Sequence, residues 1–306
     1  MTKIRINTEN NDNYLNLQKS HLHRMKQHNL QINIEKIISE RIPEKKKYIP
    51  GFFIRLIERL ICQKKLNELL MANADKEGVD FSIGILDTLR ISTEIHGEDN
   101  LPPQDNASDW RVIFVSNHPL GGLDGMSIIR LIGEKSHSRS VRFIVNDLLM
   151  NIPPLKGIFL PVNTLSGNQT RSAAQLLDES FSSSEPIAIF PAGLCSRLID
   201  GKIQDLKWNK MFINKAIKYQ RDIIPLHFEG LNSVFFYKFA KLRKLLRIPF
   251  NIEMALLPRE IFRNEQSKFK ITVGKRISWR ELRGGPDADS SAKKIRHYVY
   301  SLPNLG

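Results

Sequence analysis

Apolar runs separated by turn residues follow one another from residue 110 to the end of the chain. β-Branched and aromatic runs predict strands at residues 111–116, 141–145, 158–162, 187–190, 223–227, 252–256 and 269–274. Apolar residues at helical spacing predict helices near residues 123–134, 171–181, 207–219 and 233–246. Strands that alternate with helices are typical of a mostly parallel sheet covered by helices, so we expect an α/β fold.

The first hundred residues have a different pattern. Residues 1–44 are polar apart from one short periodic patch, which predicts a polar N-terminal arm. Residues 45–100 predict a helical region that ends in a short strand-like segment, and residues 101–306 predict the α/β domain. The helix predicted from residue 51 is amphipathic and basic. Such a helix either packs on the domain or lies on a membrane surface.

Charge adds a partner to this picture. The 306 residues include 46 Lys and Arg against 32 Asp and Glu, a net charge of +14. This excess indicates an anionic partner, either nucleic acid or an anionic membrane surface. Residues 235–247 form a second basic amphipathic stretch. Its basic residues alternate largely with aliphatic side chains and no nucleic-acid-binding motif is present, so we expect a membrane and no nucleic acid.

The same sequence bounds the location of the protein. No apolar run approaches the roughly 18 residues of a transmembrane helix, and the first residues lack the apolar core of a signal peptide. Two cysteines suit a reducing compartment. We therefore expect a cytoplasmic protein that is peripheral on the inner face of the cell membrane.

Candidate chemistry lies at the end of the first predicted strand of the α/β domain. The strand runs into Asn117-His118-Pro119, two glycines follow, and Asp124 lies where the next helix begins. Ligands meet α/β sheets at such junctions. An imidazole that titrates near neutral pH, with a carboxylate to fix its tautomer, suits a general base. The same residues also fit a structural loop histidine beside a helix-capping aspartate.

The segment from Asn117 to Asp124, NHPLGGLD, resembles the His/Asp signature of the glycerolipid acyltransferases, the lysophosphatidic acid acyltransferase superfamily. It is most similar to the bacterial lyso-aminolipid (ornithine or glycine lipid) O-acyltransferases of the hemolysin-like branch. Five residues separate His and Asp here, whereas the family usually has four. Residues 157–163, 190–193 and 224–226 resemble the second, third and fourth family blocks. The resemblance implies acyl transfer with His118 as general base and Asp124 as its orienting partner.

Two family blocks depart from the family pattern. Asn163 stands where the second block usually carries an arginine, Ala192 replaces the glutamate of the third block, and Arg197 falls two residues late. The resemblance implies that those positions bind an acceptor phosphate, and neither Asn163 nor Ala192 reproduces an arginine fork. We expect a lyso-aminolipid acceptor, with lysophosphatidic acid as the alternative. The expected substrate-binding residues are Asn117, Gly121, Gly122, Asn163, Pro191, Gly193 and Arg197.

The remaining expectations concern the reaction partners. The resemblance implies an acyl thioester donor, on acyl carrier protein or coenzyme A, and no metal or redox cofactor. The eight histidines have no ligand-like spacing. We expect the amides of Gly121 and Gly122 to face the developing oxyanion. One rival is an acyl-ester hydrolase or thioesterase, in which water replaces the acceptor. Cys195 raises another, a hydrolase with a thiolate nucleophile, although a buried structural cysteine also fits and no Gly-x-Ser-x-Gly elbow is present.

Overall fold

The structure is a computed structural model that describes residues 30–41, 49–136, 138–146, 149–150, 152–162, 171–247 and 251–304. The chain divides into two compact units, Met1–Lys76 and Glu77–Gly306, and each is described by itself. The second unit begins before α6 (Gly78–Thr88), so it includes a helix and a strand that the sequence pattern groups with the N-terminal region.

The first unit contains α2 (Ile34–Arg41), α4 (Gly51–Leu60) and α5 (Gln63–Met71). The Asn67 side chain of α5 bonds to both the amide and the carbonyl of Ile32, at 2.8 and 2.9 Å. The basic amphipathic helix predicted from residue 51 is divided in two, because Cys62 adopts a left-handed conformation with φ of 52°. Most of the expected polar arm, residues 1–29 and 42–44, lies outside the described residues.

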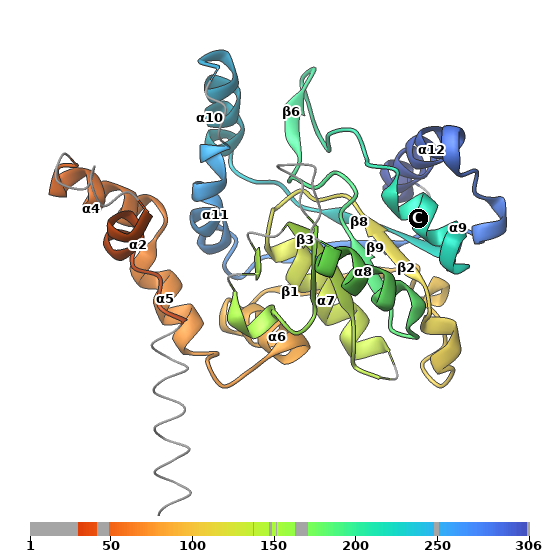
Figure 1. The fold of residues 1–306 in the computed structure, drawn as a ribbon. Helices are drawn as coiled ribbons and strands as arrows, with labels where there is room; N and C mark the ends of the chain where they lie inside the picture. Colours follow the sequence, from red (N-terminus) through yellow and green to blue (C-terminus); the bar gives the residue numbers. More distant parts are fainter. Residues whose placement is uncertain are drawn as a thin grey trace, which may run out of the picture. The chain divides into compact units, whose positions relative to one another are not determined.

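The second unit is built on a seven-stranded sheet in the order β1-β9-β8-β2-β5-β3-β4 (Figure 1). The strands are β1 (Ser92–His96), β2 (Ile113–Ser116), β3 (Arg142–Asn146), β4 (Phe159–Val162), β5 (Ile187–Ile189), β8 (Ile223–Glu229) and β9 (Lys268–Val273). The strands from β8 to β4 in this order are all parallel, whereas β9 is antiparallel to β8 and β1 is parallel to β9. A separate antiparallel hairpin consists of β6 (Arg197–Ile199) and β7 (Lys202–Gln204).

Helices surround this sheet. Besides α6 they are α7 (Leu123–Lys135), α8 (Arg171–Ser182), α9 (Met211–Tyr219), α10 (Val234–Leu245), α11 (Leu257–Arg263) and α12 (Ala288–Ser301). Alternate side chains of the parallel strands, such as Ile113 and Ile187, are fully buried in one core with Phe181 of α8 and Phe212 of α9. The expected α/β fold with a mostly parallel sheet is confirmed. Within the described residues, no helix has both the length and the apolar character needed to span a membrane.

One expected strand is wrong. Residues 252–256 form a 3-10 helix, η5 (Ile252–Leu256), which leads directly into α11. Glu253, Met254 and Ala255 are good helix formers, and Pro258 is well placed in the first turn of α11. The place beside β8 is taken by β9 instead.

The strand order determines where ligands can bind. β2 lies between β8 and β5, and the three strands are parallel, so their carboxyl ends share one edge of the sheet. The loops that follow β2, β5 and β8 therefore converge at this edge, which we call the carboxyl edge.

Candidate functional site

His118 and Asp124 meet at the carboxyl edge. His118 follows β2, and Asp124 lies in the first turn of α7. The chain turns back between them, so that His118 Nδ1 lies 2.9 Å from Asp124 Oδ2. Gly121 lies in this turn with φ of 78°, a conformation that favours glycine. The loop therefore accommodates the extra residue of the signature and still forms the His–Asp pair.

Asp124 is completely buried and is surrounded by donors. Besides His118, its carboxylate accepts hydrogen bonds from the amides of Leu120, Gly121, Gly122 and Gly125 at 2.9–3.3 Å. Burial by itself would raise the pKa of Asp124. The charge and hydrogen bond of His118 and the backbone amides outweigh this effect and lower the pKa below 3.8. Asp124 is therefore a buried carboxylate at neutral pH.

These contacts correct the expected oxyanion site. The amides of Gly121 and Gly122 donate to Asp124, so in this structure they stabilise the aspartate rather than face a substrate. The two glycines serve the His–Asp pair by forming its turn.

The imidazole of His118 is held on its face as well as its edge. Its ring stacks on Phe190, with centroids 3.8 Å apart and planes 15° apart, and the side chain is 14% exposed. Because an ionised carboxylate only accepts, Nδ1 of the neutral ring carries the proton and Nε2 carries the lone pair. Nε2 lies across the ring from Asp124, so it is the basic atom left for a substrate.

A second buried carboxylate, Asp205, holds the loop of His118 in place. Its Oδ1 accepts from the His118 amide at 3.2 Å and from the Ser196 hydroxyl at 2.6 Å, and its Oδ2 accepts from the Trp208 indole at 2.9 Å. The Ser196 amide in turn donates to the His118 carbonyl at 2.7 Å. Burial raises the pKa of Asp205. The sequence analysis missed Asp205, because nothing around it in the chain signals contact with residue 118.

Changing Asp205 to asparagine is expected to loosen this loop. The side-chain NH₂ of asparagine would replace Oδ2, so that it and the Trp208 indole N–H are two donors facing each other. The unsatisfied buried donor is expected to lower the free energy of unfolding by about 1–3 kcal/mol. As a positioning residue it is expected to affect kcat much more than the KM for the acyl donor. Asp200→Asn, in the exposed turn of the β6–β7 hairpin that precedes Asp205, is the matched control. An Asp205→Asn enzyme with normal stability and kcat would contradict this role.

Arg197 is close to the site but already has partners. Its guanidinium donates to the Cys195 carbonyl at 2.7 Å and to the buried Glu253 at 3.0 Å, and it lies 5.5 Å from the Phe236 ring centroid. Glu253 also forms an ion pair with Arg243 at 2.8 Å. Arg197 therefore ties the loop after β5 to η5 and α10, and at 11% exposure it presents little of its charge to a ligand.

The other expected substrate-binding residues have different surroundings. Asn117 is buried, and its side-chain amide bonds to both the amide and the carbonyl of Phe228 in β8, at 2.7 and 2.9 Å. Pro191 is buried and Gly193 is exposed in the loop after β5, with φ of 70° at Gly193. Asn163 lies outside the described residues. Phe190, the first residue of the third family block, is not among the residues expected from the sequence, although an aromatic residue directly after a strand end was a usable signal.

Cys195 does not have the surroundings of a nucleophile. It is fully buried, and burial raises its pKa to about 11 despite the nearby Arg197. The group is therefore a thiol at neutral pH, whereas attack requires a thiolate. In the described part of the chain, no cluster of three His, Cys, Asp or Glu residues is arranged to hold a metal ion.

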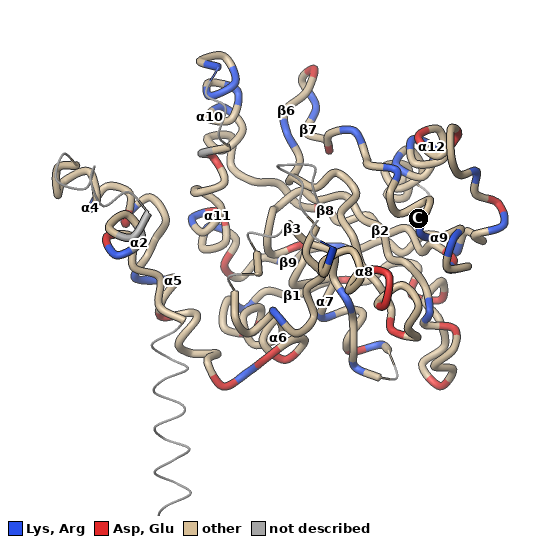
Figure 2. The backbone as a smooth tube through the Cα atoms, in the orientation of Figure 1, with Lys and Arg blue, Asp and Glu red and all other residues tan. Residues whose placement is uncertain are grey.

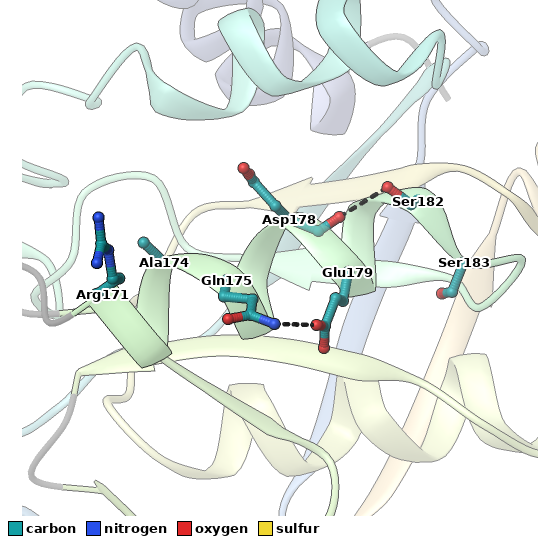
Figure 3. A pocket seen from close by; sticks show the side chains of 7 residues that line it. All are labelled: Arg171, Ala174, Gln175, Asp178, Glu179, Ser182 and Ser183. Atoms are coloured by element: carbon teal, nitrogen blue, oxygen red, sulfur yellow. Dashed lines mark hydrogen bonds between the residues drawn. The ribbon is translucent and has the colours of Figure 1, made fainter.

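Two of the hollows that the described residues of the second unit form lie at different places relative to the His–Asp pair. One, of about 700 Å³, borders the His118 loop and is lined by residues that include Asn117, Pro119, His227, Lys270 and Tyr300. The other runs along α8 and is lined from Arg171 to Ser183 (Figure 3). Its lining comes from one helix and the residue after it, and Asp178 within it pairs with Lys215 and Lys218 of α9. The first hollow is therefore the candidate for a substrate site, because it borders the His118 loop at the carboxyl edge; His118 and Asp124 themselves are not among the residues that line it.

Comparisons with known proteins agree on the family. Residues 36–305 match the family model described as Acyltransferase. The chain is 40% identical to a lyso-glycine lipid O-acyltransferase of Phocaeicola vulgatus, over 89% of this chain and 95% of that protein. It is 38% identical to a protein of the same name from Bacteroides thetaiotaomicron, over 89% and 97% of the two chains.

A solved structure is also similar. The crystal structure of the 1-acyl-sn-glycerophosphate (LPA) acyltransferase from Thermotoga maritima aligns with a TM-score of 0.45 and 16% identity, over 83% of this chain and 88% of that chain. The family assignment depends on the two lyso-glycine lipid enzymes and on the family model, whose matched residues include the His–Asp pair and the sheet that carries it. The resemblance found in the sequence is confirmed: the chain belongs to the acyltransferase family and is an acyltransferase enzyme.

Proposed function

We propose that this enzyme transfers a fatty acyl group from an acyl thioester to the hydroxyl of a lyso-lipid whose headgroup is an amino acid carboxylate, as in a lyso-glycine lipid. The observation that carries the proposal is the buried His118–Asp124 pair in a chain 40% identical to an enzyme with that activity in its name. The reaction class requires a base beside a hydroxyl, and we assign this role to Nε2 of His118, whose other ring nitrogen bonds to Asp124.

In the proposed reaction His118 acts as a general base. Nε2 takes the proton of the acceptor hydroxyl while the hydroxyl oxygen attacks the thioester carbonyl carbon. The carbon–sulfur bond then breaks, and the departing thiolate takes the proton from the imidazolium. Asp124 keeps the proton on Nδ1 and stabilises the imidazolium, because it is a buried carboxylate 2.9 Å away.

The charges around the hollow favour a monoanionic headgroup. Lys270 faces the hollow but pairs with Glu229 at 2.6 Å, and Lys268 pairs with Glu94 at 2.6 Å. His227 adds no charge at neutral pH, because burial lowers its pKa to about 4. The lysine charges are thus balanced, which suits a single carboxylate better than a phosphate dianion.

Side-by-side assays test the acceptor. With one acyl donor, kcat/KM is expected to be at least about tenfold higher for lyso-glycine lipid than for lysophosphatidic acid of equal chain length. The reason is that the second negative charge of the phosphate lacks a compensating cation, and a cost of about 1.4 kcal/mol corresponds to a factor of about ten. A preference for lysophosphatidic acid would overturn the headgroup assignment and leave the His118 chemistry standing. Release of free fatty acid without an acceptor would indicate a hydrolase.

We also propose where the enzyme meets its substrates. The donor is an acyl thioester of acyl carrier protein or coenzyme A, and the net charge of +14 suits both an acidic carrier protein and an anionic bilayer. The lyso-lipid would be taken from the inner face of the cell membrane by a peripherally bound enzyme.

A further inference from the structure

Exposed apolar side chains gather on and beside α10. Among the described residues they are Leu231, Val234, Phe235, Leu242, Leu245 and Leu246, with exposures from 45% at Phe235 to 78% at Leu245. Single exposed leucines are common on protein surfaces, but a continuous group is not. α10 stands at the edge of the second unit, above α11 in Figure 1.

The apolar residues lie on the outward face of the helix. Phe236, Tyr237 and Ala240 are buried, and α10 packs through them onto η5 and the β6–β7 hairpin. Val234, Leu242 and Leu245 are spaced at eight and three residues, so they share the opposite face. A helix that only packed on its own domain would present its polar residues there.

Lysines accompany these apolar side chains. Lys238 and Lys241 are exposed on the outward face. α10 has no acidic residue (Figure 2). Arg259 of α11 adds a cation 5.2 Å from the Phe235 ring centroid. By contrast, Arg243 is 16% exposed and pairs with Glu253, so it is not part of this surface. Apolar side chains surrounded by lysines complement an anionic bilayer in both apolar character and charge.

This face is connected to the reaction site. The Asn232 side chain donates to the carbonyls of Pro119 and Leu120 at 3.2 and 3.4 Å, directly after His118. Ser233 caps α10 and is held by the buried Glu260 of α11 at 2.6 Å. The start of the helix is therefore fixed to the turn that carries the His–Asp pair.

We propose that the outward face of α10 docks on an anionic lipid bilayer, with Leu242 and Leu245 inserted among the lipids and Lys238 and Lys241 at the headgroups. Docking through this face brings the membrane to the helix that is fixed to the His118 turn. The inference rests on the proposed function in one respect, since a lipid acceptor is the reason for the enzyme to bind a membrane.

A local spectroscopic probe tests the contact. Leu245→Cys, labelled with an environment-sensitive fluorophore in a Cys62→Ser background, is mixed with vesicles of phosphatidylcholine containing one third phosphatidylglycerol. A blue shift is expected, whereas the same label at Leu176→Cys, an exposed leucine of α8, is expected to stay in water. The local readout is needed because α4 also exposes Phe52 and Phe53. An unshifted label at residue 245 on bound protein would overturn the proposal.

Sedimentation with the same vesicles measures the energetic effect. Leu245→Asp is expected to lower the partitioning of the protein onto vesicles at least about tenfold, because a charge replaces a leucine that is buried in the bilayer when the protein is bound. Leu176→Asp is expected to leave the partitioning unchanged. Lys238→Gln with Lys241→Gln is expected to weaken binding, and Lys293→Gln with Lys294→Gln on α12 is the control. Wild-type binding should fall as salt rises from about 0.1 M to 1 M, where the Debye length shrinks from about 10 Å to 3 Å.

The outcome is separate from that of the acyl-transfer assay. Leu245→Asp should retain turnover with a short-chain, water-soluble acceptor, because it leaves the His118 turn intact. If the wild-type enzyme binds vesicles but acylates no lyso-lipid, the proposed function fails and the docking surface stands. If Leu245→Asp binds vesicles like the wild type, the docking surface fails and the proposed function stands.

Discussion

His118→Ala is expected to lower kcat/KM by about 10²–10⁴-fold, the contribution typical of a positioned general base. Without the imidazole, the basic Nε2 that Asp124 orients through Nδ1 is lost. The ring is stacked on Phe190 and mostly buried, so a stability loss of about 1–3 kcal/mol is also expected.

Two further variants separate the loss of the base from a loss of structure. His118→Asn keeps a donor where Nδ1 faces Asp124 but has no base at Nε2, so it should be folded and equally inactive. His96→Ala is the matched control, because His96 also pairs with a carboxylate, Glu94, at 2.6 Å. β1 runs antiparallel to β2 in the sheet, so His96 lies at the edge opposite His118. Near-normal turnover by folded His118→Asn enzyme would contradict general-base catalysis by His118.

Asp124→Asn is expected to damage stability and turnover together. Asparagine replaces one acceptor oxygen by an amide that opposes either His118 and Leu120 or Gly122 and Gly125, leaving at least one buried donor unpaired at about 1–3 kcal/mol. Where the NH₂ group of the introduced asparagine faces Nδ1 of His118, Nδ1 must accept a hydrogen bond, so the neutral imidazole adopts the tautomer that has its lone pair on Nδ1. Nε2 then carries the proton and the base is lost, so kcat should fall about 10²-fold or more.

The pH dependence of stability gives this prediction a second readout. The pKa of Asp124 is below its ordinary 3.8 in the folded state, so ionised Asp124 stabilises the fold above pH 3.8. That contribution is lost as the pH falls through the lowered pKa. The difference in unfolding free energy between wild type and Asp124→Asn should therefore be constant near neutral pH and shrink in acid.

A first-turn aspartate on another helix supplies the control. Asp80 lies in the first turn of α6 as Asp124 does in α7, but it is exposed and pairs with Arg139. Asp80→Asn should change stability by about 0–1 kcal/mol and leave turnover intact. If Asp124→Asn behaves like Asp80→Asn, Asp124 only caps its helix.

Local sequence was sufficient for the fold class and the His–Asp pair. Strand, turn and helix follow within residues 113–135, so the neighbours of His118 and Asp124 along the chain bring them together. The alternation of strands and helices predicts the parallel sheet because each apolar strand must be covered on both faces. The signature residues carried the family assignment, which the family model confirms.

Only the tertiary structure decided what holds and surrounds this pair. Asp205 reaches the His118 amide across 87 residues, and Asn232 reaches Pro119 across 113. Arg197 reads as a ligand-binding cation in the sequence, yet Glu253, from a segment mistaken for a strand, pairs with it. Residues 235–247 likewise form a basic amphipathic stretch in the sequence. Only the packing of α10 shows that Phe236 and Tyr237 are buried while Leu242 and Leu245 are exposed. A periodic pattern defines the two faces of a helix, but contacts distant in sequence decide which one is buried.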